Sequence, residues 1–226
     1  PHKFEPGQVK DGLLLMGWGF FQKLVIADRI AILVNDVYGN YTGYSGMQIF
    51  LATILFAFQI YCDFAGYSDI AVGGARVMGF RLTKNFKSPY LAVTVSEFWR
   101  NWHISLTTWF RDYVYIPLGG NRCSRARKYR NLLLTFTASG LWHGAGWNFV
   151  VWGALNGFYQ VVGDLTGPFR TWLKERMRIC VNCGSYHLFQ GVVTFLLVDF
   201  AWLFFRADSI AAALGMLRHG IHNIGL

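Results

Sequence analysis

Residues 131–163 read NLLLTFTASGLWHGAGWNFVVWGALNGFYQVVG, a stretch without Asp, Glu, Lys or Arg that contains one histidine, His143. Basic or polar segments lie on both sides of it, and short basic loops are usually cytoplasmic in membrane proteins. A segment between two cytoplasmic loops must enter the membrane and return. Its first arm, residues 131–141, would as a helix cover roughly half of the hydrocarbon core. The pattern therefore predicts a bend at residues 142–147, near mid-membrane.

The predicted bend gives His143 a particular environment. Non-helical backbone at membrane depth is tolerated only where it is buried in protein or lines a watery cavity. An ionisable side chain at that depth is a functional candidate by default. His143 would thus lie on a polar path through the protein. One long tilted helix that carries His143 along its length is the alternative interpretation.

The composition of the whole chain favours a polytopic membrane protein. Of its 226 residues, 54% are hydrophobic and only 15% are charged, whereas about a quarter are charged in soluble domains. The net charge is +9, and the basic residues cluster in two short loops, which suits cytoplasmic contact with anionic lipid. No nucleic-acid motif is present, so no nucleic-acid partner is predicted. The clusters are Arg122, Arg125, Arg127, Lys128 and Arg130, and Arg170, Lys174, Arg176 and Arg178.

Three further apolar segments complete the expected architecture. Residues 47–73 and 188–206 are long enough for membrane spans, which need about 20 residues. Residues 13–38 include charged side chains and suit a helix at the interface or against a protein interior. No signal peptide can be read after Pro1, so residues 1–226 are interpreted as one membrane-embedded region, an internal fragment of a longer chain. The predicted fold class is all-α, a polytopic transmembrane helical bundle with re-entrant and interfacial amphipathic helices.

Two charged residues near the end of the first predicted span share one helix face. Asp69 and Arg76 are seven residues apart, or about two turns. Carboxylates at membrane depth are usually paired or functional. An Asp69–Arg76 interaction that holds the helix in its bundle is the preferred interpretation, and a role along a substrate path is the alternative. Close helix contacts are expected at the small residues Gly66, Gly73, Gly74 and Gly79.

Residues 94–113 predict one amphipathic helix lying flat in the membrane interface. Thr94 and Glu97 fit a capping box at its start. Aromatic and apolar side chains recur at helical spacing, and charged side chains lie opposite, which suits the headgroup level. His103 lies on the boundary between the two faces. The apolar stripe consists of Trp99, Trp102, Leu106, Trp109 and Tyr113.

Cys180 and Cys183 have the spacing of a redox or metal-binding pair, and His187 is close to them in the sequence. One such pair without a second is a weak zinc signal. Two unrelated thiols in a loop are therefore the preferred interpretation, and no metal site is predicted.

General base catalysis is the chemistry that His143 could perform. A buried neutral imidazole can take a proton from an acceptor hydroxyl as that oxygen attacks a thioester. Gly144 and Gly146 would let the backbone approach a substrate closely. Ser139, one turn earlier, is a less favoured nucleophile because no orienting acid is evident. The side chains expected to wall the cavity are those of Trp142, Trp147 and Asn148.

A set of motifs, in order over nearly the whole chain, carries a family resemblance. They are QIYCDFAGYSD (59–69), GFRL (79–82), NF (85–86), FWRNWHIS (98–105), YIPLGGNR (115–122), LWHGAGW (141–147) and DFAWLFFR (199–206). Together they resemble the membrane-bound O-acyltransferase (MBOAT) family, and within it the bacterial alginate O-acetylation proteins.

This resemblance implies a multi-helix acyltransferase with a central tunnel in the bacterial cell (inner) membrane. The histidine of the family's Trp-His-Gly motif is taken as catalytic, which here is His143, and His103 is implied to matter near the entrance of the donor. The implied donor is acetyl-CoA or another acyl thioester, with no tightly bound cofactor. The implied acceptor is a cell-surface polysaccharide, often served by a separate extracytoplasmic acetyltransferase. Substrate contacts are expected from Trp142, Trp147, Asn148, Asp69 and Arg76.

Other functions fit parts of the same pattern. D-alanyl transfer to teichoic acid, from a carrier protein, is the activity of a related branch of the family. A transporter or channel would instead use Asp63, Asp69, Arg76 and His143 to line a permeation path, although no inverted repeat supports it. A purely structural membrane subunit is the remaining alternative.

Overall fold

The computed structural model describes residues 5–225, and these form helices and connecting segments without a β-strand. This agrees with the predicted all-α class. The chain divides into two compact units, one of residues 1–86 with 214–226 and the other of residues 87–213. They are called the first and second unit below, and each is described by itself.

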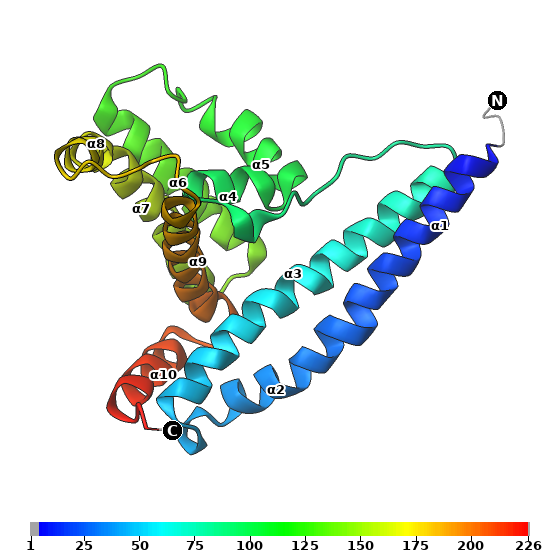
Figure 1. The fold of residues 1–226 in the computed structure, drawn as a ribbon, viewed down its shortest axis with the longest axis horizontal. Coiled ribbons are helices and arrows are strands. Elements are labelled where there is room, and N and C mark those ends of the chain that lie inside the picture. The colour runs from blue at the N-terminus through cyan, green and yellow to red at the C-terminus, as the bar shows by residue number, and fades with distance from the viewer. Residues whose placement is uncertain (1–4, 226) are drawn as a thin grey trace. The chain divides into compact units, whose positions relative to one another are not determined.

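The first unit is built on a long helical hairpin (Figure 1). One arm consists of α1 (Pro6–Phe20), the π-helix η1 (Phe21–Ala27) and α2 (Asp28–Gly39). After the 3₁₀ turn η2 (Tyr41–Gly43), the chain returns as the 32-residue α3 (Gly46–Val77). Ser45 and Gln48 form a capping box at the start of α3, which satisfies backbone donors that a helix end otherwise leaves free.

Glycines bring the two arms of this hairpin together. A Cβ added to Gly73 would lie 2.6 Å from the carbonyl oxygen of Gly12, and one added to Gly66 would lie 2.7 Å from that of Gly19. These backbones therefore touch where any larger residue would clash. The prediction of close contacts is confirmed at Gly66 and Gly73, whereas Gly74 faces open space.

The charged side chains of the first unit pair differently from the prediction. Lys23 in η1 forms ion pairs with Asp28 at 2.8 Å and with Asp63 at 2.6 Å. Among the described residues, Asp69 and Arg76 form no ion pair with each other, so that predicted interaction is wrong. Two helical turns separate them by roughly 10 Å along the axis, which is too far for the short aspartate side chain to bridge.

The second unit consists of short helical segments and three longer helices, α6, α7 and α9. They are η3 (Pro89–Leu91), α4 (Val95–Asn101), α5 (Ile104–Phe110), the π-helix η4 (Arg111–Tyr115), α6 (Arg125–His143), α7 (Trp147–Leu165), α8 (Gly167–Arg176) and α9 (Gly184–Arg206). The final helix, α10 (Ile210–His222), begins in this unit and ends in the first.

Helices α6 and α7 form a tight hairpin, and its turn lies where the sequence predicts the bend. Helix α6 ends at His143 and α7 begins at Trp147, so the alternative of one long helix is wrong. Glycines again allow close approach, since a Cβ on Gly140 would lie 2.2 Å from the Phe149 carbonyl oxygen and one on Gly153 would lie 2.3 Å from that of Phe136.

The predicted single amphipathic helix over residues 94–113 is wrong. The chain leaves helical geometry at Trp102, and His103 takes a left-handed conformation with φ 43°. The start is close to the prediction, because the Thr94 hydroxyl accepts a hydrogen bond from the Glu97 backbone N–H at 3.1 Å. The Glu97 carboxylate, however, accepts from the backbone of Val93 instead of Thr94. The helical spacing of the apolar side chains continues across the break, so the sequence pattern does not predict it.

Cys180 and Cys183 form a disulfide, so the prediction of two unrelated thiols is also wrong. Within residues 5–225, two helices, α3 and α9, are long and apolar enough to cross a membrane. They correspond to the two spans predicted at residues 47–73 and 188–206. Length and composition are the basis of this assignment.

Candidate active site

One cavity of about 230 Å³ in the second unit contains both central histidines. Its walls come from α4, α5, η4, α6 and α7, and they include the side chains of Trp99, Trp102, Phe136 and Ser139. We call it the histidine cavity. The fold thereby brings His103 and His143, which are 40 residues apart in the sequence, to one site.

His143 is the last residue of α6, and aromatic rings hold its imidazole. The ring centroids of Trp142, Trp152 and Phe205 lie 5.0, 5.2 and 5.3 Å from its own. All three meet it nearly edge to face, with interplanar angles of 83°, 90° and 78°, an arrangement that aromatic pairs favour. This packing fixes the direction of the imidazole at the end of a rigid helix.

His103 lies at the break between α4 and α5. A non-glycine residue in left-handed backbone is uncommon and costs free energy, and such residues cluster at functional sites. Thr107 stabilises the break twice, because its backbone N–H donates to the His103 carbonyl at 2.9 Å and its hydroxyl donates to the Trp102 carbonyl at 3.1 Å. Burial, and then the nearby His143, lowers the pKa of His103 to about 4.

A buried hydrogen-bond chain supports the aromatic wall. The indole N–H of Trp99 donates to the Asn156 side-chain oxygen at 3.1 Å, and the Asn156 amide donates to the Trp152 carbonyl at 2.8 Å. Trp152 in turn stacks on Trp202 of α9. This support was not among the features predicted from the sequence. A signal existed, because Trp152 and Asn156 are four residues apart and therefore share one face of α7.

The other predicted site residues of the second unit lie at different depths. Trp142 is 59% exposed and its ring is 6.4 Å from that of His103, so it contacts both histidines. Trp147 is 75% exposed and is absent from the cavity wall. Asn148 is buried and donates to the Ala207 carbonyl at 3.0 Å, which ties the start of α7 to the end of α9. Substrate contacts by these residues remain predictions.

Asp69 and Arg76 belong to α3 of the first unit, whereas the histidine cavity is lined by the second unit alone. Arg76 lines another cavity, of about 390 Å³, together with Asp11 and Arg81. Arg76 thus lines a different cavity from the two histidines, and Asp69 lines neither cavity. Within residues 5–225, no three His, Cys, Asp or Glu side chains are grouped so that they could hold a metal ion.

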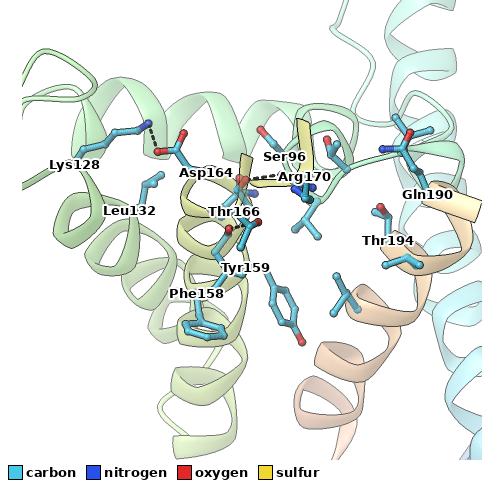
Figure 2. A pocket seen from close by; sticks show the side chains of 18 of the residues that line it. Ser96, Lys128, Leu132, Phe158, Tyr159, Asp164, Thr166, Arg170, Gln190 and Thr194 are labelled. Atoms are coloured by element: carbon cyan, nitrogen blue, oxygen red, sulfur yellow. Dashed lines mark hydrogen bonds and ion pairs between the residues drawn. The ribbon is translucent and has the colours of Figure 1, made fainter. Parts of the chain in front are cut away.

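A larger cavity, of about 780 Å³, adjoins the histidine cavity (Figure 2). The two share four wall residues, which are Ser96, Tyr115, Leu132 and Gln160. Lys128 and Asp164 form an ion pair of 2.9 Å at its polar side, while Phe158, Val193 and Leu197 supply apolar wall. The lining therefore combines a charged region with an apolar region.

Comparison with known proteins gives this arrangement a context. The family model of the MBOAT, membrane-bound O-acyltransferase family, matches residues 13–198. The chain is 42% identical to a "Probable alginate O-acetylase AlgI" of Pseudomonas aeruginosa over 197 residues, covering 86% of this chain and 35% of that protein. It is 36% identical to a "Peptidoglycan O-acetyltransferase" of Helicobacter pylori over 221 residues, covering 95% of this chain and 40% of that protein.

A more distant relative carries another activity in its name. The chain is 28% identical to a "Teichoic acid D-alanyltransferase" of Bacillus subtilis over 204 residues, covering 83% of this chain and 48% of that protein. The matched region thus spans between about a third and a half of the length of these curated relatives.

Proposed function

Because the chain belongs to the membrane-bound O-acyltransferase family, we propose that it forms the histidine-bearing part of an enzyme that moves an acetyl group from a cytoplasmic thioester towards hydroxyl groups of a cell-surface polysaccharide. The observation that carries the proposal is the meeting of His103 and His143 in one aromatic cavity. The relatives named as O-acetylating alginate or peptidoglycan support the acetyl group and the polysaccharide acceptor.

In the proposed reaction, neutral His143 takes the proton of an acceptor hydroxyl while that oxygen attacks the thioester carbonyl. A carbon–oxygen bond forms and the carbon–sulfur bond breaks. The proton then passes from His143 to the departing thiolate, which leaves as a thiol. The edge-to-face contacts from Trp142, Trp152 and Phe205 orient the imidazole.

His103 has a different part in this proposal. Its lowered pKa keeps the imidazole neutral at pH 7, and a neutral imidazole has one N–H donor and one acceptor nitrogen. From the strained break it can donate a hydrogen bond to the thioester carbonyl oxygen as negative charge develops there. His103 would therefore bind the acyl donor, and His143 would bind the acceptor hydroxyl.

We place the protein in the bacterial cell (inner) membrane as a multi-pass protein. The two helices that could cross a membrane, α3 and α9, support this. Acetyl-CoA or another acyl thioester is the proposed donor, and an extracytoplasmic acetyltransferase is a proposed partner for delivery to the polysaccharide. The basic cluster from Arg122 to Arg130 would face anionic lipid on the cytoplasmic side.

D-alanyl transfer to teichoic acid is a second candidate, because relatives with that name match the chain at lower identity. The donor separates the two functions. Membranes containing the full-length protein should pass label from radiolabelled acetyl-CoA to surface polysaccharide and none from a D-alanyl carrier protein. Label from the carrier protein alone would contradict the acetyl proposal and support D-alanyl transfer.

A further inference from the structure

The larger cavity contains three charged side chains, and their charges do not cancel. Lys128 and Asp164 neutralise each other at 2.9 Å. Arg170 has no carboxylate partner among the described residues; its guanidinium donates to the Gly163 carbonyl. The cavity therefore has a net positive charge centred at Arg170. Figure 2 shows Arg170 at the same polar side as Lys128 and Asp164.

Arg170 retains the capacity to bind an anion. Its guanidinium has five N–H donors in a planar fork that matches phosphate geometry, and the Gly163 carbonyl takes one of them. This bond also places the exposed Arg170 side chain near the end of α7. The hydroxyl residues Thr94 and Ser96 line the same cavity and offer additional donors, whereas the Thr166 hydroxyl donates to the Val162 carbonyl.

The distance from Arg170 to the histidines can be estimated from the rise of α7 between the residues that contact them. Trp152 contacts the His143 ring, and Gly163, which contacts Arg170, lies eleven residues further along the same helix. At 1.5 Å per residue, the separation is about 16 Å. The phosphopantetheine arm has a backbone about as long as four to five extended peptide residues, which spans about 15 Å. Such an arm fits the distance from Arg170 to the histidine cavity.

From these observations, and resting on the function proposed above, we infer that Arg170 binds the phosphate of a phosphopantetheine thioester in the larger cavity. Its arm passes the shared wall of Ser96 and Gln160, and the thioester reaches His103 and His143. Coenzyme A and the prosthetic group of a carrier protein contain the same phosphopantetheine, so Arg170 would serve either source. Arg170 thereby selects the donor by its phosphate.

Donors that differ in their phosphate test this inference. Acetyl-CoA, acetyl-phosphopantetheine and S-acetyl-N-acetylcysteamine all have the same acetyl thioester, and the last has no phosphate. In the full-length protein, Arg170→Gln should raise the KM for each of the two phosphate-bearing donors about tenfold, because a hydrogen bond to a charged group is lost. The KM for the phosphate-free donor should not change.

The matched control is Arg176→Gln, which makes the same change on the same helix at a residue that does not line the cavity. It should leave all three KM values unchanged. An equal effect of Arg170→Gln on all three donors would overturn the inference, because it would mean a structural role or a lipid headgroup at Arg170. No effect on any donor would overturn it as well.

Direct binding separates this inference from the proposed function. Wild-type protein should bind CoA in equilibrium dialysis about tenfold more tightly than Arg170→Gln. If this difference is found without acetyl transfer from any donor, the acetyltransferase proposal fails while the Arg170 site stands. If acetyl transfer is found and CoA binding is the same in both proteins, the Arg170 site is contradicted while the proposed function stands.

Discussion

The two helix pairs α1/α3 and α6/α7 use the same means of close packing but differ at the residues around it. In both, glycines place one backbone against another, with Gly12 and Gly73 in the first unit and Gly140 and Gly153 in the second. In the first unit, the nearby charges of Lys23, Asp28 and Asp63 satisfy one another. In the second, the hairpin ends in a turn that presents His143 to a cavity.

This difference indicates what each pair contributes. The α1/α3 pair is a packed helical hairpin in which Lys23 forms ion pairs with Asp28 and Asp63. The α6/α7 pair has the same kind of glycine contacts, and in this pair they fix the position of the His143 imidazole at the end of α6. A perturbation of similar size should therefore affect only folding in the first pair, and both folding and chemistry in the second.

Among the variants that change packing or position, the largest effect is expected from Gly153→Val in the second pair. The added Cβ would lie 2.3 Å from the Phe136 carbonyl oxygen, so α6 must shift and His143 must move with it. Overpacking of this kind costs about 1–3 kcal/mol or more, and a displacement of about 1 Å at a site can cost 10²-fold in rate. Folded protein and acetyl transfer per folded molecule should both fall; unchanged specific activity would contradict the coupling.

A smaller and purely structural effect is expected from Gly73→Val in the first pair. Its Cβ would lie 2.6 Å from the Gly12 carbonyl oxygen, whereas the neighbouring Gly74 has nothing within 4 Å. Gly73→Val should lower the free energy of unfolding by about 1–3 kcal/mol. This loss should be visible as a lower thermal midpoint in detergent. Gly74→Val, the matched control, should not. Equal midpoints for the two variants would show that the glycine contact does not hold the pair.

Within the second unit, Thr107 is a positioning residue for His103. Thr107→Val removes the hydroxyl that donates to the Trp102 carbonyl, so the His103 break should relax and kcat should fall about tenfold, the equivalent of one hydrogen bond. KM should change little. Thr107→Ser keeps the hydroxyl and should restore kcat, and failure of this rescue would argue against the hydroxyl's role.

The smallest effect concerns pH and stability. His103 has a pKa of about 4 in the folded protein against 6.5 for an ordinary histidine. Between these values the unfolded chain binds a proton that the folded chain does not, so stability is lost as pH falls below 6.5. The thermal midpoint should therefore drop less from pH 7 to pH 5 in His103→Gln than in wild type. His187→Gln, at an exposed histidine, should behave like wild type.

The sequence was sufficient for those elements that long apolar runs and turn residues define. The two helices that could cross a membrane, the turn after His143 and the contacts at Gly66 and Gly73 followed from hydropathy and small-residue spacing. The break at His103 did not, because Thr107 stabilises it locally while the apolar stripe continues past it. The Cys180–Cys183 disulfide, the Trp99–Asn156 bond and the pairing of Lys23 with Asp63 depend on three-dimensional contacts that spacing alone does not encode.

The candidate site, too, could be predicted from the sequence only in part. Both histidines were identified from motif and position, but their meeting in one cavity required the fold. Trp147 and Asn148 were expected to wall that cavity because they adjoin His143 in sequence. The start of α7 instead directs Asn148 towards the carbonyl of Ala207 and leaves Trp147 exposed, since successive residues of a helix point about 100° apart.

The most direct test of the central claim is acetyl transfer by His143→Ala in the full-length protein. Membranes with equal amounts of folded protein would receive radiolabelled acetyl-CoA, and label in the extracted surface polysaccharide would be counted beside wild type and His187→Ala. The account predicts that His143→Ala lowers label about 10²- to 10⁴-fold, the usual contribution of a general base, while His187→Ala does not. Label equal to wild type in His143→Ala would contradict the account.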